Sequence, residues 1–501
     1  MGDTMSYIVS ALESVFSPLG LLVNLVGVTL GIIFGAMPGL NGVVGIALLL
    51  PLTYNMAPQF GLIMLGGLYM GSTYGGSISA ILLNCPGTGE AACTALNGNP
   101  LAKQGKSKEA LYASVMASGI GGIFGVLTML LFTPVLAKAA LQFGPAEMFL
   151  VSLMGLAVVG SLMGKSLAKG FFSVAFGLVL SIVGMDPTSV NYRFTFGNMH
   201  LQSGLNLIPV SVGFFAIAEM LNLLFQNNEN EVVARKEKET YSVSDGWKDL
   251  LSRWRIVLKS SIIGTIIGIL PGTGGAIASF IAYGEAKRTS KERKQFGYGS
   301  KDGIVAPESA NNAAVGGSFV PLLSLGIPGS ATSAIIFGAL TVHGLIPGPR
   351  LFSEHANVVY ALMIGLLAST ILMVVLGISG TRLFTNVLKI KTHYIIPAVL
   401  AFSILGAYSA QNSLFDILIA VVFGLIGLLF KRTGIPIAPA VLGMILGSMT
   451  EQNLRQSMVI AAAKGKNVLS YILFRPISVV IFCLILLLIW GNFKTRLRGN
   501  E

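Results

Sequence analysis

Long apolar runs, separated by short polar loops, make up most of the sequence. A membrane helix needs about 20 mostly apolar residues, and many of the runs approach or reach that length. The pattern therefore predicts an all-α polytopic membrane protein with about ten to fourteen crossings. The runs lie at 19–37, 62–83, 112–136, 146–163, 167–184, 205–225, 256–284, 358–379, 394–410, 414–430, 435–449 and 468–490.

The run at 256–284 is interrupted by glycine and proline. It contains GTIIGILPGTGG at 264–275, where Pro271, Gly272 and Gly274 replace helix-forming residues. Proline removes a backbone donor and glycine exposes the peptide, so we expect the helix to break there. Within hydrocarbon an irregular backbone is tolerated only where protein or a water-filled cavity covers it. The break is therefore a candidate binding site.

A second copy of this pattern lies in the first half of the chain. Gly is common, at 61 of 501 residues, but five matches at one fixed offset that include a proline are hard to obtain by chance. The matches pair Gly31, Gly35, Pro38, Gly39 and Gly42 with Gly264, Gly268, Pro271, Gly272 and Gly275. A second set pairs Gly75, Gly76, Ser77, Pro86, Gly87 and Thr88 with Gly316, Gly317, Ser318, Pro328, Gly329 and Ser330.

These matches predict two structural repeats, each with two broken or re-entrant helices. We expect an N-terminal membrane repeat at 1–226, a hydrophilic cytoplasmic linker at 227–255 and a C-terminal membrane repeat at 256–501. A strongly basic loop at 287–301 follows the break of the second repeat, whereas the corresponding loop at 55–60 is uncharged. Since basic loops stay in the cytoplasm, the repeats are expected to be inverted. The basic residues at 103–108 argue against this, and a parallel arrangement stays open.

Composition supports the membrane assignment. Hydrophobic residues make up 53% and charged residues only 11% of the chain, which excludes an ordinary soluble globular protein. The net charge of +12 is better explained by cytoplasmic Lys and Arg than by nucleic-acid binding. Terminal Lys494, Arg496 and Arg498 place the C-terminus in the cytoplasm.

The sequence lacks the residue patterns of common enzymes. Its four histidines are widely separated, GTGG is not followed by the Lys-Ser or Lys-Thr of a phosphate loop, and no base accompanies the serines of the glycine-rich runs. We therefore expect neither catalysis nor a bound cofactor.

The breaks themselves offer an anion site. A half-helix that begins within the membrane presents free N–H groups and the positive end of its dipole, which suits a carboxylate. Unwound carbonyls near Gly272 and Gly329 are candidates for Na⁺. The alternative is that the breaks are only kinks and close-packing positions. The predicted substrate-binding residues are Pro38, Gly39, Asn41, Gly42, Ser77, Pro86, Gly87, Thr88, Pro271, Gly272, Thr273, Gly274, Pro328, Gly329, Ser330 and Thr332.

A polar cluster, APESANN, lies at 306–312 beside an apolar run. Glu308 at membrane depth would be a proton or cation site, with Ser309, Asn311 and Asn312 around it. We assign these four residues to ion coupling or gating. The alternative is that Glu308 faces the membrane interface near the basic loop.

Several of these motifs resemble one known family. PGLNG, YGGSISAILLNCPGTG, ILPGTGG, APESANNAAVGG and LGIPGSATSAIIFGAL are similar to signature runs of the large membrane subunit of the tripartite tricarboxylate transporters, the TctA family. The resemblance covers nearly the whole chain.

The resemblance implies a permease in the bacterial inner membrane. Its partners would be a small four-helix membrane subunit and a periplasmic solute-binding protein. It would import citrate or related carboxylates, driven by a gradient of Na⁺ or H⁺. The alternative is a channel or scaffold subunit without coupled transport, and whether the chain forms a homo-oligomer stays open.

Overall fold

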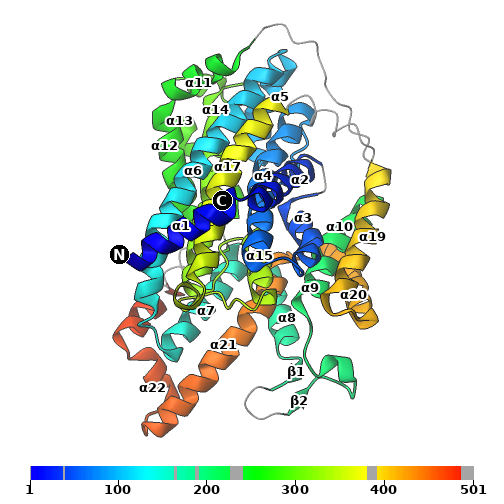
Figure 1. The fold of residues 1–501 in the computed structure, drawn as a ribbon, viewed down its shortest axis with the longest axis vertical. Coiled ribbons are helices and arrows are strands. Elements are labelled where there is room, and N and C mark those ends of the chain that lie inside the picture. The colour runs from blue at the N-terminus through cyan, green and yellow to red at the C-terminus, as the bar shows by residue number, and fades with distance from the viewer. Residues whose placement is uncertain are drawn as a thin grey trace.

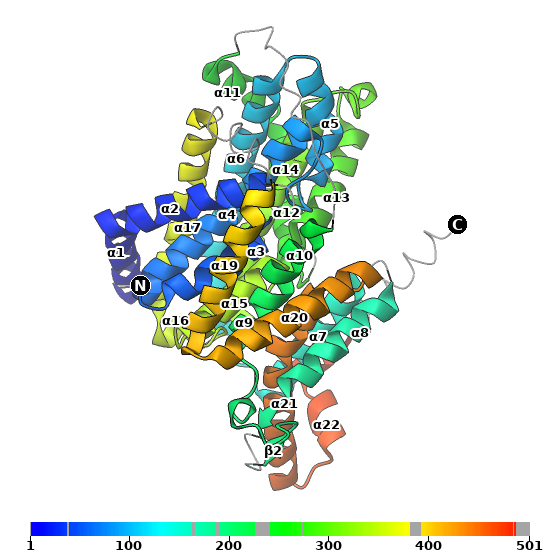
Figure 2. The ribbon, with the colours of Figure 1, turned by 90° about the vertical axis from the view of Figure 1, so that its right-hand side faces the viewer.

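A computed structural model describes residues 2–37, 40–162, 166–186, 191–225, 241–272, 274–380, 392–483 and 485–486. Over these residues the chain is almost entirely helical, which confirms the predicted class (Figure 1). One small antiparallel hairpin pairs β1 (Gly184–Met185) with β2 (Tyr192–Arg193). Figures 1 and 2 show this hairpin with α21 and α22 at one end of the molecule and α5 and α11 at the other.

The helices of the first half follow the predicted runs closely. They are α1 (Gly2–Phe16), α2 (Pro18–Ala36), α3 (Gly42–Leu49), η1 (Leu50–Thr53), α4 (Pro58–Leu83), α5 (Ala92–Lys103), α6 (Ser107–Ala140), α7 (Pro145–Leu162), α8 (Leu167–Ser181), η2 (Met199–Leu201), α9 (Leu207–Ser211), the π-helical η3 (Val212–Ile217) and α10 (Ala218–Leu224).

The second half has a similar succession of helices. They are α11 (Val243–Ser252), α12 (Trp254–Ile269), α13 (Gly274–Thr289), η4 (Arg293–Gln295), α14 (Asp302–Leu325), α15 (Ala331–Val342), α16 (Leu351–Glu354), α17 (Ala356–Ser379), α19 (Thr392–Gln411), α20 (Leu414–Thr433), α21 (Ala438–Ala463) and α22 (Val468–Leu473). Among the described residues, five continuous helical stretches are long and apolar enough to cross a membrane: α2, α6, α9 through α10, α17 and α20.

Two nearly fully buried helices, α4 and α14, form the centre of the molecule. Helix α2 packs along α4, and α12 and α6 pack along α14. Glycines bring these backbones into contact, because a Cβ on Gly35 would lie 2.2 Å from the Ser72 carbonyl oxygen and one on Gly268 would lie 2.5 Å from that of Ala314. Small residues permit such close approach of membrane helices.

The glycines that contact the two central helices are paired by the sequence matches: Gly35, which contacts α4, corresponds to Gly268, which contacts α14. Helix α4 ends at Asn84 and α14 at Gly326, both in the left-handed backbone region. A repeat relation would produce this similarity. The repeats, their inversion and the proposed domain limits stay predictions.

Helices from the two halves interleave. Helix α6 packs on α14 and α17 packs on α4, while α21 packs against α7 and α8, and α20 packs against η3 and α10. Helices of each half therefore pack against helices of the other half, and the two halves form one helical structure.

The described part of the predicted linker is ordered by charge pairs. It forms α11 and the first turn of α12, and residues 226–240 lie outside the described ranges. Arg253 makes ion pairs with Asp249 at 2.5 Å, Glu292 at 2.6 Å and Asp302 at 2.8 Å. These pairs join α11, α12, η4 and α14 at the end of the molecule that also carries α5.

Candidate functional site

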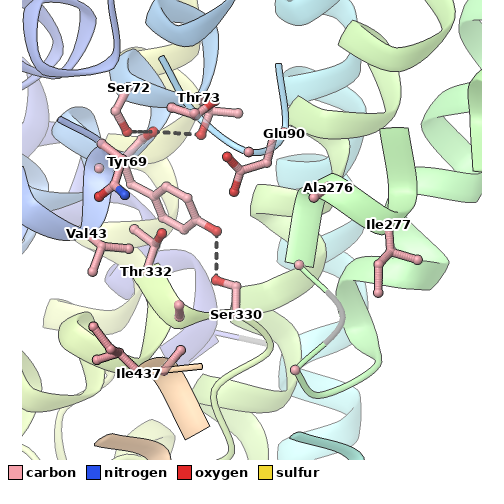
Figure 3. Close-up of a pocket in the computed structure, with 18 of the residues that line it drawn as sticks. Val43, Tyr69, Ser72, Thr73, Glu90, Ala276, Ile277, Ser330, Thr332 and Ile437 are labelled. Carbon is pink, nitrogen blue, oxygen red and sulfur yellow. Dashed lines mark hydrogen bonds between the residues drawn. The ribbon is translucent and has the colours of Figure 1, made fainter. Parts of the chain in front are cut away.

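A cavity of about 550 Å³ lies where several helices begin (Figure 3). Its walls come from distant parts of the sequence, including both halves of the chain. The residues that line it are Asn41, Gly42, Val43, Tyr69, Ser72, Thr73, Thr88, Gly89, Glu90, Gly272, Gly274, Ala276, Ile277, Ser330, Ala331, Thr332, Pro436, Ile437 and Ala438.

Four helix N-termini meet at this cavity. Helix α3 starts after Asn41, whose side-chain oxygen accepts a hydrogen bond of 3.0 Å from the Val44 N–H. Helix α15 starts after Ser330, and α13 and α21 begin at Gly274 and Ala438. Each N-terminus carries free N–H groups and partial positive charge. The helix N-termini therefore contribute partial positive charge to the cavity, whose described lining contains no Lys, Arg or His.

The backbone of the second half forms a tight turn at the cavity. The Gly272 N–H donates a 3.0 Å hydrogen bond to the Gly329 carbonyl, which ties the break between α12 and α13 to the one between α14 and α15. Gly272 has a φ of 76° and Gly274 a φ of 65°, a region that side chains other than glycine rarely adopt. The glycines of ILPGTGG thus permit the turn that exposes the start of α13.

Helix α4 contributes a wall of hydroxyl groups. The Tyr69 hydroxyl and Ser330 Oγ are 2.9 Å apart (Figure 3). Ser72 and Thr73 both donate to the Tyr69 carbonyl at 2.9 Å. Thr88 Oγ1, by contrast, is buried and has no hydrogen-bond partner among the described residues. Helix α4 thus places hydroxyls at the cavity that are already hydrogen-bonded, whereas the Thr88 hydroxyl, in the connection between α4 and α5, has no partner among the described residues.

The structure brings many of the predicted binding residues together. Those that line the cavity are Asn41, Gly42, Thr88, Gly272, Gly274, Ser330 and Thr332. Those that lie elsewhere are Ser77, Pro86, Gly87, Pro271, Pro328 and Gly329. Pro38, Gly39 and Thr273 lie outside the described residues.

Two of the residues outside the lining have an evident packing role. A Cβ on Gly87 would lie 1.9 Å from the Gly35 carbonyl oxygen, and one on Gly329 would lie 2.7 Å from the Gly268 carbonyl oxygen. For these two glycines the structure favours the close-packing alternative.

Sequence reasoning missed several lining residues. Tyr69, Ser72 and Thr73 lie within an apolar run, where the glycine density suggested helix packing. Glu90 directly follows the PGTG break, and an acid at that position was a usable signal. The segment 436–438 looked like an ordinary apolar run, although Pro436 and Pro439 mark the start of a helix.

The predicted coupling cluster is buried but does not line the cavity. Glu308 is completely buried, and its carboxylate accepts hydrogen bonds from Ser77 at 2.5 Å, from Ser118 at 2.7 Å and from Thr94. Ser309, Asn311 and Asn312 are also buried. Glu308 therefore links α14 to α4, α5 and α6. In the described ranges no group of three or more His, Cys, Asp or Glu side chains is arranged to hold a metal ion.

A smaller chamber of about 230 Å³ adjoins the cavity. The two share Asn41, Pro436 and Ile437. The wall of the chamber includes an ion pair between Lys431 of α20 and Glu219 of α10. The charges in the wall of the chamber are thus paired with each other.

Comparison with known proteins identifies the family. Residues 21–442 match the Tripartite tricarboxylate transporter TctA family, a span that contains every residue lining the cavity. The chain belongs to this family. The TctA family assignment confirms the resemblance seen in the motifs and makes the chain a multi-pass membrane subunit of a transporter, one of several subunits.

Two curated relatives come from Agrobacterium vitis. The chain is 35% identical over 461 residues to the "uncharacterized 52.8 kDa protein in TAR-I ttuC' 3'region", covering 92% of this TctA family chain and 91% of the relative. It is 37% identical over 198 residues to the "uncharacterized protein in TAR-II ttuC' 3'region", covering 40% of the chain and 82% of that relative. No solved structure matches the chain.

Proposed function

We propose that this TctA family chain is the permease subunit of a binding-protein-dependent secondary transporter that imports carboxylate anions, such as citrate or related di- and monocarboxylates. Its partners are a small four-helix membrane subunit and a periplasmic solute-binding protein. The complex lies in the bacterial inner membrane with the C-terminus of this chain in the cytoplasm, and a Na⁺ or H⁺ gradient drives uptake.

The convergence of four helix N-termini on one cavity carries this proposal. An exposed helix N-terminus stabilises an anion by about 0.3–1 kcal/mol, and by up to about 2 kcal/mol where it is partly buried. Several such termini can hold a carboxylate without a buried Lys or Arg, whose charge would be costly in the membrane. Hydroxyls of Tyr69, Thr88 and Ser330 provide donors for the oxygens of the same ligand.

The other predicted residues have roles around this site. Glu308, Ser309, Asn311 and Asn312 of α14 act in coupling or gating, because all four are buried and both Glu308 and Asn311 bond to α4. Pro271 and Pro328 end the helices that precede the breaks. The turn at Gly272, tied by its N–H to the Gly329 carbonyl, keeps the start of α13 and the start of α15 facing the ligand.

Uptake of radiolabelled citrate and related carboxylates by membrane vesicles tests this function. The vesicles should contain the complete complex and be assayed with and without added binding protein, under imposed Na⁺ or pH gradients. Uptake that requires both the binding protein and a gradient supports the proposal. Flux that is independent of any gradient would instead indicate a channel, and absence of carboxylate uptake in all conditions would contradict the proposal.

The site assignment has its own test. Replacing Gly272 by alanine forces a side chain into the left-handed backbone region and changes the turn between α12 and α13. We expect uptake to fall at least about tenfold in a correctly inserted protein. Gly284→Ala, within α13 and with open space around the added carbon, is the matched control.

A further inference from the structure

Glu90 is the only ionisable carboxylate among the described residues that line the cavity. Figure 3 shows its side chain directed into the cavity, on the side of the Tyr69 hydroxyl. Within the part of the chain that the structure describes, no Lys or Arg forms an ion pair with Glu90.

A bare carboxylate conflicts with the function proposed for this cavity. At an effective dielectric constant of about 20, two negative charges roughly 5 Å apart weaken binding by about two orders of magnitude. The helix N-termini would have to stabilise Glu90 and the substrate at the same time. A cation bound beside Glu90 removes this conflict, because the site then carries the substrate charge alone.

A second oxygen lies beside Glu90 without a partner. Asn311 is 1% exposed, and its Oδ1 accepts no hydrogen bond from any described residue. A Cβ on Gly275 would lie 2.3 Å from Asn311 Oδ1 and 2.9 Å from Glu90 Cγ, so both groups converge on the first turn of α13. The Asn311 amide nitrogen lies 3.5 Å from the Thr73 carbonyl, and Oδ1 is the atom that lies against Gly275.

The half-buried Glu90 carboxylate and the buried, unpartnered oxygen of Asn311 suit a hard cation. A carboxylate and an amide carbonyl are ligands that such cations prefer, and an unsatisfied buried acceptor is otherwise costly. Thr88 Oγ1, two residues before Glu90 and also buried without a partner, supplies a further oxygen to the same cavity.

We propose that Glu90 and the side-chain oxygen of Asn311 form a Na⁺ site beside the carboxylate site, and that occupation of this site couples substrate binding to the Na⁺ gradient. The proposal rests on the proposed function for its meaning in transport, but the cation site stands on its own geometry. Na⁺ and carboxylate then bind with positive cooperativity, because each neutralises the charge that the other meets. Thermodynamic linkage makes the two effects equal. The factor by which bound Na⁺ raises the affinity for the carboxylate is the factor by which bound carboxylate raises the affinity for Na⁺.

The other candidates for a cation site are less available. The Gly329 carbonyl already accepts the Gly272 N–H. The Glu308 carboxylate accepts three hydroxyl donors and does not line the cavity. Glu219 of the adjoining chamber is paired with Lys431. Among the described residues, the Glu90 and Asn311 pair joins a carboxylate that lines the cavity to a buried oxygen without a hydrogen-bond partner.

Binding of ²²Na⁺ to the purified full-length chain, without substrate, tests the site directly. We expect saturable binding by the wild type, at least about tenfold weaker binding by Glu90→Gln and by Asn311→Ala, and intermediate binding by Glu90→Asp. Glu354→Gln, an exposed acid on α16, is the matched control and should bind as the wild type does. Size-exclusion profiles and thermal unfolding must match the wild type for the comparison.

The outcomes separate this inference from the proposed function. The inference is overturned if Glu90→Gln binds Na⁺ as tightly as the wild type does. It is also overturned if the wild type shows no saturable Na⁺ binding, as would be the case if protons drive uptake. If Glu90→Gln does not fold, Asn311→Ala with unchanged affinity overturns it equally. In vesicles, citrate uptake that remains Na⁺-dependent in Glu90→Gln contradicts the inference alone, whereas absence of wild-type carboxylate uptake contradicts the proposed function.

Discussion

Replacing Gly35 by alanine is expected to push α2 away from α4. An added Cβ would lie 2.2 Å from the Ser72 carbonyl oxygen, 2.8 Å from the Ser72 Cα and 2.9 Å from its carbonyl carbon. All three are backbone atoms of α4, so no side-chain rotation can relieve the contact. Since an ordinary contact begins near 3.4 Å, α2 and α4 must move apart by about 1.2 Å.

The expected cost follows from packing and helix propensity. Overpacking a well-packed core usually costs about 1–3 kcal/mol, and backbone contacts belong to the upper part of that range. Alanine regains about 0.5–1 kcal/mol through its better helix propensity. The net loss of stability is therefore about 2 kcal/mol. At an unfolding entropy of roughly 2.1 cal/mol/K per residue, a chain of 501 residues shifts its Tm by about 1 °C per kcal/mol, so a fall of about 2 °C is expected.

Thermal unfolding in detergent, followed by fluorescence-detected size exclusion, measures this effect. Gly284→Ala is the control because nothing lies within 4 Å of its added carbon, so it should keep or raise the Tm. Uptake should also fall in Gly35→Ala, since Ser72 lines the cavity. Equal Tm values for the two variants would refute the argument that backbone contact of α2 and α4 needs glycine.

Three further predictions concern single side chains. Ser330→Ala removes the cap of α15 and the partner of Tyr69, and should cost about 1 kcal/mol in unfolding free energy and raise the apparent KM for uptake; an unchanged KM would argue against Ser330 as a ligand contact. Arg253→Ala leaves the buried Asp302 without its ion pair and should cost about 2–4 kcal/mol in a denaturation assay, whereas exposed Arg255→Ala should be neutral. Glu308→Gln replaces a carboxylate that accepts hydrogen bonds from three hydroxyls by an amide, whose N–H₂ group cannot accept them. The Tm should therefore fall, and an unchanged Tm would show that Glu308 does not link the helices.

The helical membrane class and the places where helices break could be predicted from sequence. Proline and glycine act locally, so ILPGTGG predicts a break wherever the helix lies in the fold, and the structure ends α12 and begins α13 around it. The capping residues Asn41 and Ser330 were predictable for the same reason, because a side chain that caps a helix acts within three residues of itself.

The rest of the site depends on partners that are distant in the sequence. Tyr69 faces the cavity because α4 packs beside the start of α15, 261 positions further along the chain. The apolar run at 435–449 gives no sign that its first residues complete a wall. Glu308 could be singled out as a buried acid, but the hydroxyls that hold it could not, because serine and threonine are common on closely packed membrane helices.

The bonds to Glu308 have a consequence for biosynthesis. Ser77 precedes its carboxylate partner by 231 residues, and Ser118 by 190. At a translation rate of about 5–20 residues per second, the hydroxyl of Ser77 waits roughly 10–50 s after synthesis before α14 emerges from the ribosome. The hydroxyls of Ser77 and Ser118 therefore lack their carboxylate partner while the first half of the chain is made.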